Sequence, residues 1–175
     1  MKGFSHMPES ASGTASVQHL AGKYLTFRLG CEEYGLPILA VREIITMLDI
    51  TPVPGSQRHV RGVINLRGKI IPVSDLRVEL GMQAATESSD TCIIVVDLIR
   101  EDSVAEIGIL VDAVSEVLDI QPEELEPPPV FGGDIDTRAL TAIARCNGEV
   151  KLLLHIERAL KLSMDDGSTE NDRID

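Results

Sequence analysis

Short runs in which hydrophobic and polar residues alternate make up most of this chain. In residues 23–29, Leu25, Phe27 and Leu29 alternate with polar neighbours, which is typical of a half-buried β-strand. Residues 32–38 form a second short run of this kind. Residues 91–98 and 105–111 are almost continuously apolar, as expected for strands that are buried on both faces. The pattern therefore predicts a protein built mainly from short strands.

Other segments predict short helices and connectors. The run LAVREIITML suits either a helical turn or a strand, and residues 56–59 could form one turn of helix. A short helix is expected in DLRVELG, with Ser74 or Asp75 as its cap and Gly81 at its end. Pro72 cannot donate a hydrogen bond to a sheet, so its strand is expected at an edge or a bulge. Residues 121–129 read as an extended connector, and a C-terminal helix begins at 156.

Two segments predict tight β-hairpins. In ARCNGEVKLLLHI the turn is Asn147-Gly148, a common two-residue hairpin loop because both residues tolerate positive φ. In GVINLRGKIIPVSDL, Arg67 stands where Asn147 stands in the other hairpin. A bulky cation is a poor choice for a strained turn, and sequences tend to break local rules at functional sites. Alternatively, Arg67 lies on a longer loop in which Gly68 alone adopts the unusual conformation.

The chain contains an internal repeat. EYGLPILAVREII (33–45) aligns with EIGILVDAVSEVL (106–118), and RGKIIPVSDL aligns with NGEVKLLLHI. Proline-containing connectors follow the first pair in both copies, and each copy opens with a strand. We therefore expect an all-β fold, with a few short helices, made of two tandem β-barrels of about five strands each.

The expected domain organisation follows from this repeat. A flexible lead-in of 1–22 precedes two modules at about 23–85 and 91–162, between which strands may be exchanged, and an acidic disordered tail follows at 163–175. Two adjacent barrels would leave a cleft, and segments carrying Val41, Val63, Gly108 and Val114 could line it. Burial in a barrel core is the alternative for each of these residues.

Composition limits the possible classes of protein. Hydrophobic residues make up 43% of the 175 residues, but aromatic residues only 3%, so the core must consist of Val, Ile and Leu. The three cysteines are too few and too far apart for a disulfide framework or a metal site. No apolar run is long enough to span a membrane and no secretion signal is evident, so a cytoplasmic protein is expected.

Charge is unevenly distributed. The net charge is −12, yet residues 42–77 hold six basic and three acidic residues, whereas residues 78–137 hold fifteen acidic residues and one arginine. Such asymmetry can steer association with oppositely charged partners, although an ordinary acidic surface is an equally good explanation. The absence of a broad basic face argues against nucleic-acid binding.

Motifs for catalysis are missing. The sequence contains no nucleophile elbow, phosphate-binding loop or dinucleotide fingerprint, and His59 and His155 lack the neighbours of a zinc helix. Asp134 and Asp136 resemble a fragment of a calcium loop, but an exposed turn explains them better. We therefore expect an interaction module that is not an enzyme and needs no cofactor or metal.

Three segments identify a family. EEYGLPILAVREII, RGVINLRGKIIPVSDLR and EIGILVDAVSEVLDI, in this order, resemble the CheW family of chemotaxis coupling proteins. The resemblance runs from about Tyr24 to Leu162 and implies two SH3-like barrels. It also implies an adaptor that couples methyl-accepting chemoreceptors to the histidine kinase CheA at membrane-receptor arrays, without entering the membrane itself.

The resemblance also implies which residues contact the partners. They fall at Val41, Glu43, Gly62, Arg67, Gly108 and Val114. His155, where Asp or Asn is expected, and the long N-terminal lead depart from the family pattern. Two alternatives remain: a CheW-like scaffold of another chemosensory system, serving twitching, development or cyclic-dinucleotide output, and, more remotely, a small-molecule-binding β-barrel.

Overall fold

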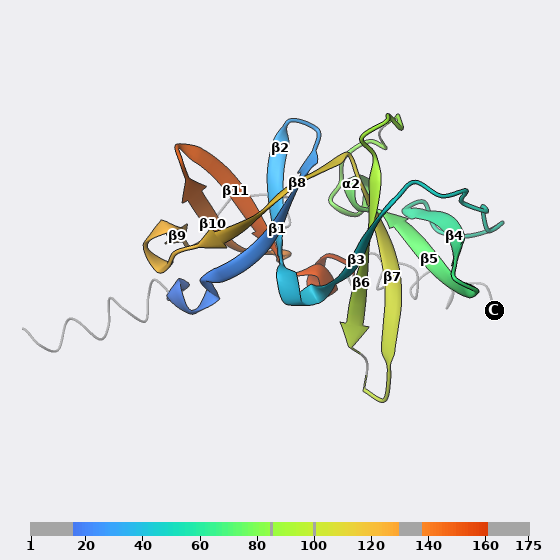
Figure 1. The fold of residues 1–175 in the computed structure, drawn as a ribbon, viewed down its shortest axis with the longest axis horizontal. Helices are drawn as coiled ribbons and strands as arrows, with labels where there is room; N and C mark the ends of the chain where they lie inside the picture. Colours follow the sequence, from blue (N-terminus) through green and yellow to red (C-terminus); the bar gives the residue numbers. More distant parts are fainter. Residues whose placement is uncertain (1–15, 85, 100, 130–137, 161–175) are drawn as a thin grey trace, which may run out of the picture.

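The computed structural model describes residues 16–84, 86–99, 101–129 and 138–160, and within them the chain forms two β-sheets. Figure 1 shows the sheets beside each other, joined at the centre of the molecule. Sheet A has six strands in the order β8-β1-β2-β11-β10-β9, and sheet B has five in the order β3-β6-β7-β5-β4. The predicted all-β fold with two subdomains is confirmed. Sheet A gains a sixth strand because the proline connector contributes the two-residue strand β9.

The bounds of the elements follow the sequence pattern closely. The strands of sheet A are β1 (Gly22–Leu29), β2 (Glu32–Pro37), β8 (Ala113–Ile120), β9 (Leu125–Glu126), β10 (Leu140–Cys146) and β11 (Glu149–Leu154). Those of sheet B are β3 (Val41–Thr46), β4 (Val60–Leu66), β5 (Lys69–Asp75), β6 (Cys92–Ile99) and β7 (Val104–Val111). Short helices are η2 (Gln18–Leu20), η3 (Ile38–Ala40), α2 (Leu76–Glu79) and η4 (Pro122–Glu124), and residues 156–160 are also helical.

The two repeats exchange hairpins, so the sheets do not coincide with modules at 23–85 and 91–162. Sheet A combines the β1–β2 hairpin of the first repeat with β8, β10 and β11 of the second, and sheet B combines β6–β7 with β3, β4 and β5. Only Asp112 separates β7 from β8, which is too short for a hairpin turn, so the chain passes directly into the other sheet. The three residues of η3 make the equivalent passage from β2 to β3.

Equivalent parallel strand pairs support the duplication. Gly35 on β2 lies opposite Leu153 on β11, and Gly108 on β7 lies opposite Val73 on β5. A Cβ atom on Gly35 would lie 2.8 Å from Leu153 Cδ2, and one on Gly108 would lie 2.7 Å from Ile93 Cγ2. Both repeats therefore place a glycine at the parallel strand pair, where an added Cβ would be too close to the other repeat at Gly35 and to the neighbouring strand of its own hairpin at Gly108.

The hydrophobic core has three parts. One cluster lies within each sheet, and the largest joins the two sheets through residues such as Phe27 and Val96. Along β6, Ile93 and Val95 face the core of sheet B, while Ile94 and Val96 face the shared core, so this strand is buried on both faces as predicted. Fully burying each such side chain contributes about 1.5–3 kcal/mol, and the shared core therefore holds the two sheets together.

Several local predictions need correction. The lead-in does not extend to residue 22, because Val17 is buried in the core of sheet A and η2 follows it. Residues 56–57 are irregular and residues 58–59 form a turn, so no helix is present there. The strand of Pro72 is not an edge, since β5 lies between β4 and β7; its pairing with β7 begins only at Val73, so the missing N–H costs no hydrogen bond there.

Other local predictions are confirmed or completed. Residues 38–46 resolve into η3 followed by β3. Asp75 caps α2 by accepting a hydrogen bond from Arg77 N at 3.0 Å, and Gly81 follows with a φ of 86°. The exposed turn expected at Asp134 and Asp136 lies outside the described residues, as does the acidic tail. No helix in the described part of the chain is long and apolar enough to cross a membrane.

Candidate functional site

The turn between β4 and β5 has the strained geometry that its sequence suggested. Arg67 has a φ of 53° and Gly68 of 85°, closely matching 54° and 79° for Asn147 and Gly148 in the β10–β11 turn. Positive φ at both central residues defines the two-residue hairpin turn that matches the twist of the strands. Asn65 Oδ1 accepts a hydrogen bond from Gly68 N at 2.9 Å and supports the turn. Arg67 thus occupies a conformation that is costly for a side chain of its size.

Arg67 forms a bidentate ion pair with Glu43 on β3. Its Nη1 and Nη2 donate to Glu43 Oε1 and Oε2 at 2.9 and 2.6 Å. The hydrogen bond from Arg67 lowers the pKa of the Glu43 carboxyl, and the same bond raises the pKa of Arg67. The Arg67 side chain is 69% exposed and that of Glu43 26%, so the arginine is also open to solvent and to a partner.

This ion pair joins the two edges of sheet B. Strand β3 is one edge and β4 the other, with the β4–β5 turn extending from it. Thr51, which follows β3, exchanges two backbone hydrogen bonds of 2.9 Å with Val63 on β4. Together these contacts curl sheet B toward the closed barrel that the repeat predicts.

Gly62 makes that closure possible. It has a φ of 144°, and a Cβ atom at this position would lie only 2.1 Å from the backbone oxygen of Thr51. No other residue type fits between the two strands without moving them. Gly62 is buried, as is Gly108, so the structure assigns both glycines a backbone role in sheet B.

The six residues implied by the resemblance lie mainly on sheet B. Glu43, Gly108 and Gly62 lie in one row across the five strands, linked by Val95 and Val73. Val41 lies near this row on β3, whereas Val114 lies on β8 in sheet A. Val41 and Val114 are both half-buried against the shared core. The structure thus brings Glu43 and Arg67 into contact and leaves Val114 on the neighbouring sheet.

A second group of charges beside Arg67 was not predicted. Arg42 Nε lies 2.9 Å from Asp97 Oδ1 and 2.7 Å from Glu106 Oε2, and Lys69 Nζ lies 2.8 Å from Glu106 Oε1. These residues come from four strands of sheet B, so their proximity depends on the sheet order and cannot be read from their spacing. The strip of alternating charges fixes the orientation of side chains around Glu43 and Arg67.

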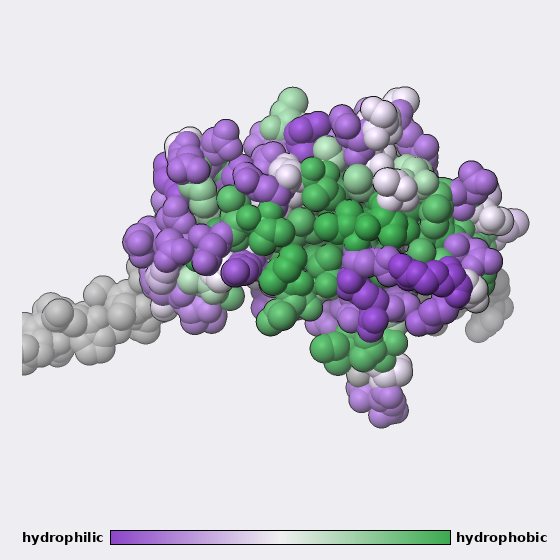
Figure 2. Space-filling model, viewed as in Figure 1, coloured by the Kyte–Doolittle hydropathy of each residue, from purple (hydrophilic) through white to green (hydrophobic). Residues whose placement is uncertain are grey.

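Apolar residues gather beside these charges. Figure 2 shows hydrophobic residues across the centre of one face, in the region where Figure 1 draws β8 and β3. Ile44 on β3 and Val117 on β8 are both exposed on the surface. An apolar area with a charged border is typical of a protein–protein contact surface.

Three polar side chains, Ser74, Glu79 and His59, lie together beside strand β5 of sheet B. Ser74 Oγ donates to Glu79 Oε2 at 2.6 Å, and His59 Nε2 lies 3.8 Å from the same carboxylate oxygen. The serine proton is thus directed at a carboxylate and not at an imidazole, and both Ser74 and Glu79 are buried. Within the described ranges, no three His, Cys, Asp or Glu side chains cluster to hold a metal ion.

Comparisons with known proteins agree with this architecture. The family model for the CheW-like domain matches residues 23–164. The chemotaxis protein CheW of Klebsiella aerogenes is 36% identical over 154 residues, which cover 85% of this chain and 90% of that protein. The solved structure of the scaffolding protein TtCheW from Thermoanaerobacter tengcongensis is 36% identical, with a TM-score of 0.69, over 77% of this chain and 89% of that one. Protein FrzA of Myxococcus xanthus is 28% identical over 79% of this chain and 85% of its own length. This chain belongs to the CheW-like family.

Proposed function

We propose that this protein is a non-catalytic adaptor that couples methyl-accepting chemoreceptors to a CheA-type histidine kinase on the cytoplasmic side of the membrane. Membership of the CheW-like family supports this role, because its relatives carry the names of chemotaxis and scaffolding proteins. The observation that carries the proposal is Arg67, a cation held in a strained turn, paired with Glu43 and still largely exposed beside an apolar surface.

The receptor contact is assigned to the face that carries β3 and β8. Here the half-buried Val41 and Val114 and the exposed Ile44 and Val117 offer apolar contacts, with the Arg67–Glu43 pair at the border. A helix from the tip of a receptor hairpin could place its apolar side chains on this surface. The arginine would then add a charge-assisted hydrogen bond that fixes the position of the helix. Gly62 contributes by allowing β4 to approach Thr51, and Gly108 by allowing β7 to pack against Ile93.

The kinase contact is assigned to the ends of the barrels. CheA-type kinases are expected to carry a related pair of barrels, so the two proteins can join end to end. Because sheets A and B differ in strand number and sequence, such contacts are heterologous and can extend into rings of alternating adaptor and kinase.

The test compares two exposed arginines that make similar ion pairs. Arg67→Asn removes the cation but keeps a residue suited to the turn, as Asn147 shows. Arg145→Ala is the control, because Arg145 also pairs with a single carboxylate, Glu126, at 2.5 Å. Each variant is combined with receptor cytoplasmic fragments and kinase from the same organism, and receptor-dependent autophosphorylation is measured.

We expect Arg67→Asn to lower kinase activation about tenfold or more, as for the loss of an anchoring residue at an interface. Arg145→Ala should activate the kinase like the parent protein, and both variants should keep the parent melting temperature within a few degrees. Full activation with Arg67→Asn would refute the role assigned to this turn.

A second candidate is a CheW-like scaffold of a different signalling array. The similarity to FrzA, which is not named for chemotaxis, favours considering it. Co-sedimentation of this protein with each receptor fragment and kinase of its own cell would separate the two candidates. Selective assembly with components that do not control swimming would support the alternative.

A further inference from the structure

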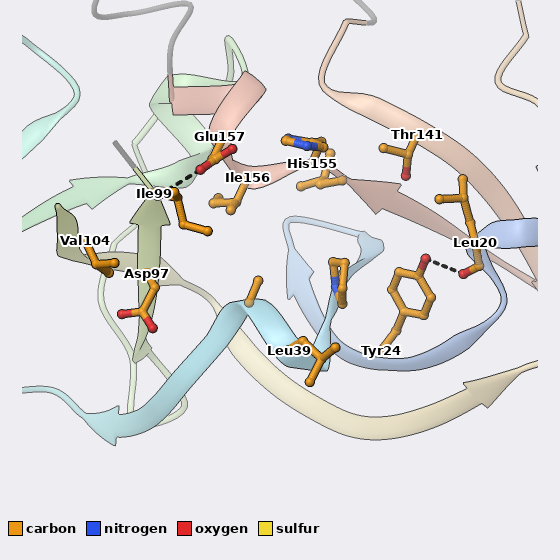
Figure 3. Close-up of a pocket in the computed structure, with 13 residues that line it drawn as sticks. Leu20, Tyr24, Leu39, Asp97, Ile99, Val104, Thr141, His155, Ile156 and Glu157 are labelled. Atoms are coloured by element: carbon orange, nitrogen blue, oxygen red, sulfur yellow. Dashed lines mark hydrogen bonds between the residues drawn. The ribbon is translucent and has the colours of Figure 1, made fainter. Parts of the chain in front are cut away.

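A groove of about 450 Å³ lies apart from the strands β3 and β8, to which the receptor contact is assigned. It is bordered by η3, by the end of β6 and start of β7, and by the helix that begins at Ile156 (Figure 3). None of the six residues assigned to receptor or kinase contacts lines it. Its volume lies in the range of concave binding sites in proteins that bury most of a small ligand.

Large apolar side chains from both repeats are exposed at the border of the groove. Leu39 is 95% exposed, Ile99 73% and Val104 57%, and all three lie around the groove in Figure 3. Below them, Tyr24 and Leu154 are buried and form part of the lining. Exposed apolar side chains that surround an apolar depression are typical of a site that another molecule covers.

The polar groups in the groove define the charge of its occupant. Glu157 Oε2 accepts a hydrogen bond from Ile99 N at 2.9 Å, and Asp97 Oδ1 accepts one from Arg42 Nε at 2.9 Å. Among the described residues that line the groove, none is Lys or Arg. The Glu157 carboxylate therefore brings a negative charge to an apolar surface and is complementary to a cation.

We propose that this groove docks an amphipathic helix of a partner protein, with apolar residues on one face and a Lys or Arg beside them. The apolar face would cover Leu39 and Ile99 on opposite sides, and the cation would pair with Glu157. The acidic C-terminal segment of this chain has the wrong charge for such a site, since residues 163–175 carry an excess of carboxylates. The groove contains no residue of β3 or β8, to which the receptor contact is assigned, so either proposal can fail without the other.

The test uses model peptides of roughly 14 residues, long enough to form a helix on binding. One peptide presents Leu at every third or fourth position with Lys beside the apolar face, and the second carries Glu in place of Lys. Binding to the full-length protein is followed by NMR chemical shifts and by fluorescence anisotropy at two salt concentrations. The variants are Glu157→Gln and Leu39→Ser, with Glu123→Gln and Val150→Ser as controls, because Glu123 and Val150 are exposed outside the groove.

The proposal expects the Lys peptide to shift resonances around Leu39, Ile99 and Ile156, and the Glu peptide to bind at least about tenfold more weakly. Glu157→Gln should weaken binding of the Lys peptide about three- to fivefold and reduce its dependence on salt, as for loss of one partly exposed ion pair. Leu39→Ser should weaken binding of both peptides, and the two controls should bind like the parent.

Four results would overturn the proposal. The first three are equal binding of the two peptides, chemical-shift changes that map to β3 and β8 instead of the groove, and no binding at about 1 mM peptide. The fourth is evidence that a segment or a second copy of this protein occupies the groove. Tighter peptide binding after deletion of residues 1–15 would show that the N-terminal segment is that occupant. A dimer in sedimentation that Leu39→Ser converts to a monomer would show that a second copy is.

Discussion

Replacing Gly62 by alanine should destabilise the protein severely, because the new methyl group has no space. Its Cβ would lie 2.1 Å from Thr51 O and 2.7 Å from Thr51 C, both backbone atoms that cannot rotate away. A φ of 144° adds strain of about 1–3 kcal/mol for a residue with a Cβ. Separating the strands to remove the clash breaks the two Thr51–Val63 hydrogen bonds, at about 0.5–1.5 kcal/mol each. The total of roughly 2–6 kcal/mol is a large part of the stability of a typical domain.

Urea denaturation of Gly62→Ala and Gly55→Ala measures this cost against a matched control. Gly55 also has positive φ, at 79°, but a Cβ there would meet nothing within 4 Å. Gly55→Ala should therefore lose only the strain, about 1 kcal/mol, whereas Gly62→Ala should lose several times more. Equal losses in the two variants would refute the close-approach argument. A fully stable Gly62→Ala that fails to couple receptors to kinase would instead place Gly62 at the partner contact.

Three further predictions concern packing and pH. Gly35→Ala and Gly108→Ala should each lower the free energy of unfolding by about 1–3 kcal/mol through overpacking. If thermal melts show a lower stability for only one of the two variants, the two glycines are not equivalent in the two repeats. Hydrogen bonds from arginine lower the pKa values of Glu43 and Glu126 below the ordinary value of 4.5, so the stabilisation by these ion pairs is present above that pH and is lost as the pH falls through the folded-state pKa values. A variant that combines Arg67→Asn with Arg145→Ala should therefore show a weaker dependence of melting temperature on pH in acid. An unchanged dependence would contradict a stabilising role of the two ion pairs. Burial lowers the pKa of Lys151, but hydrogen bonds to Glu149 and Glu33 outweigh this effect and raise the pKa above the ordinary value of 10.5. The stabilisation by these hydrogen bonds is therefore lost as the pH rises through the folded-state pKa. Lys151→Met should abolish this loss of stability in thermal melts above about pH 10.

The strands and turns could be predicted from the sequence because they depend on neighbouring residues. Alternation placed β1 and a continuous apolar run placed β6. Comparison of Arg67-Gly68 with Asn147-Gly148 identified a turn whose two versions have nearly identical φ values. The repeat predicted two β subdomains. These features need only local periodicity and turn chemistry.

The assignment of strands to sheets could not be predicted in the same way, because it depends on contacts between distant segments. The repeat is visible in the sequence, but only the length of the link at Asp112 hints that hairpins are exchanged. For the same reason Glu43 and Arg67 were candidates individually, while their ion pair was not foreseen. The groove was missed because its lining comes from segments as far apart as Leu20 and Glu157.

The exchanged hairpins also say something about how such a protein could arise. In a single copy of the repeat, the first hairpin would have no partner strands, and another molecule would have to supply them. Two unfused copies would meet that need reciprocally and form a two-fold symmetric homodimer. Joining them in one polypeptide removed the requirement that both halves stay identical. One turn can then carry Asn147 while the equivalent turn carries Arg67, so the two repeats present different side chains at equivalent positions.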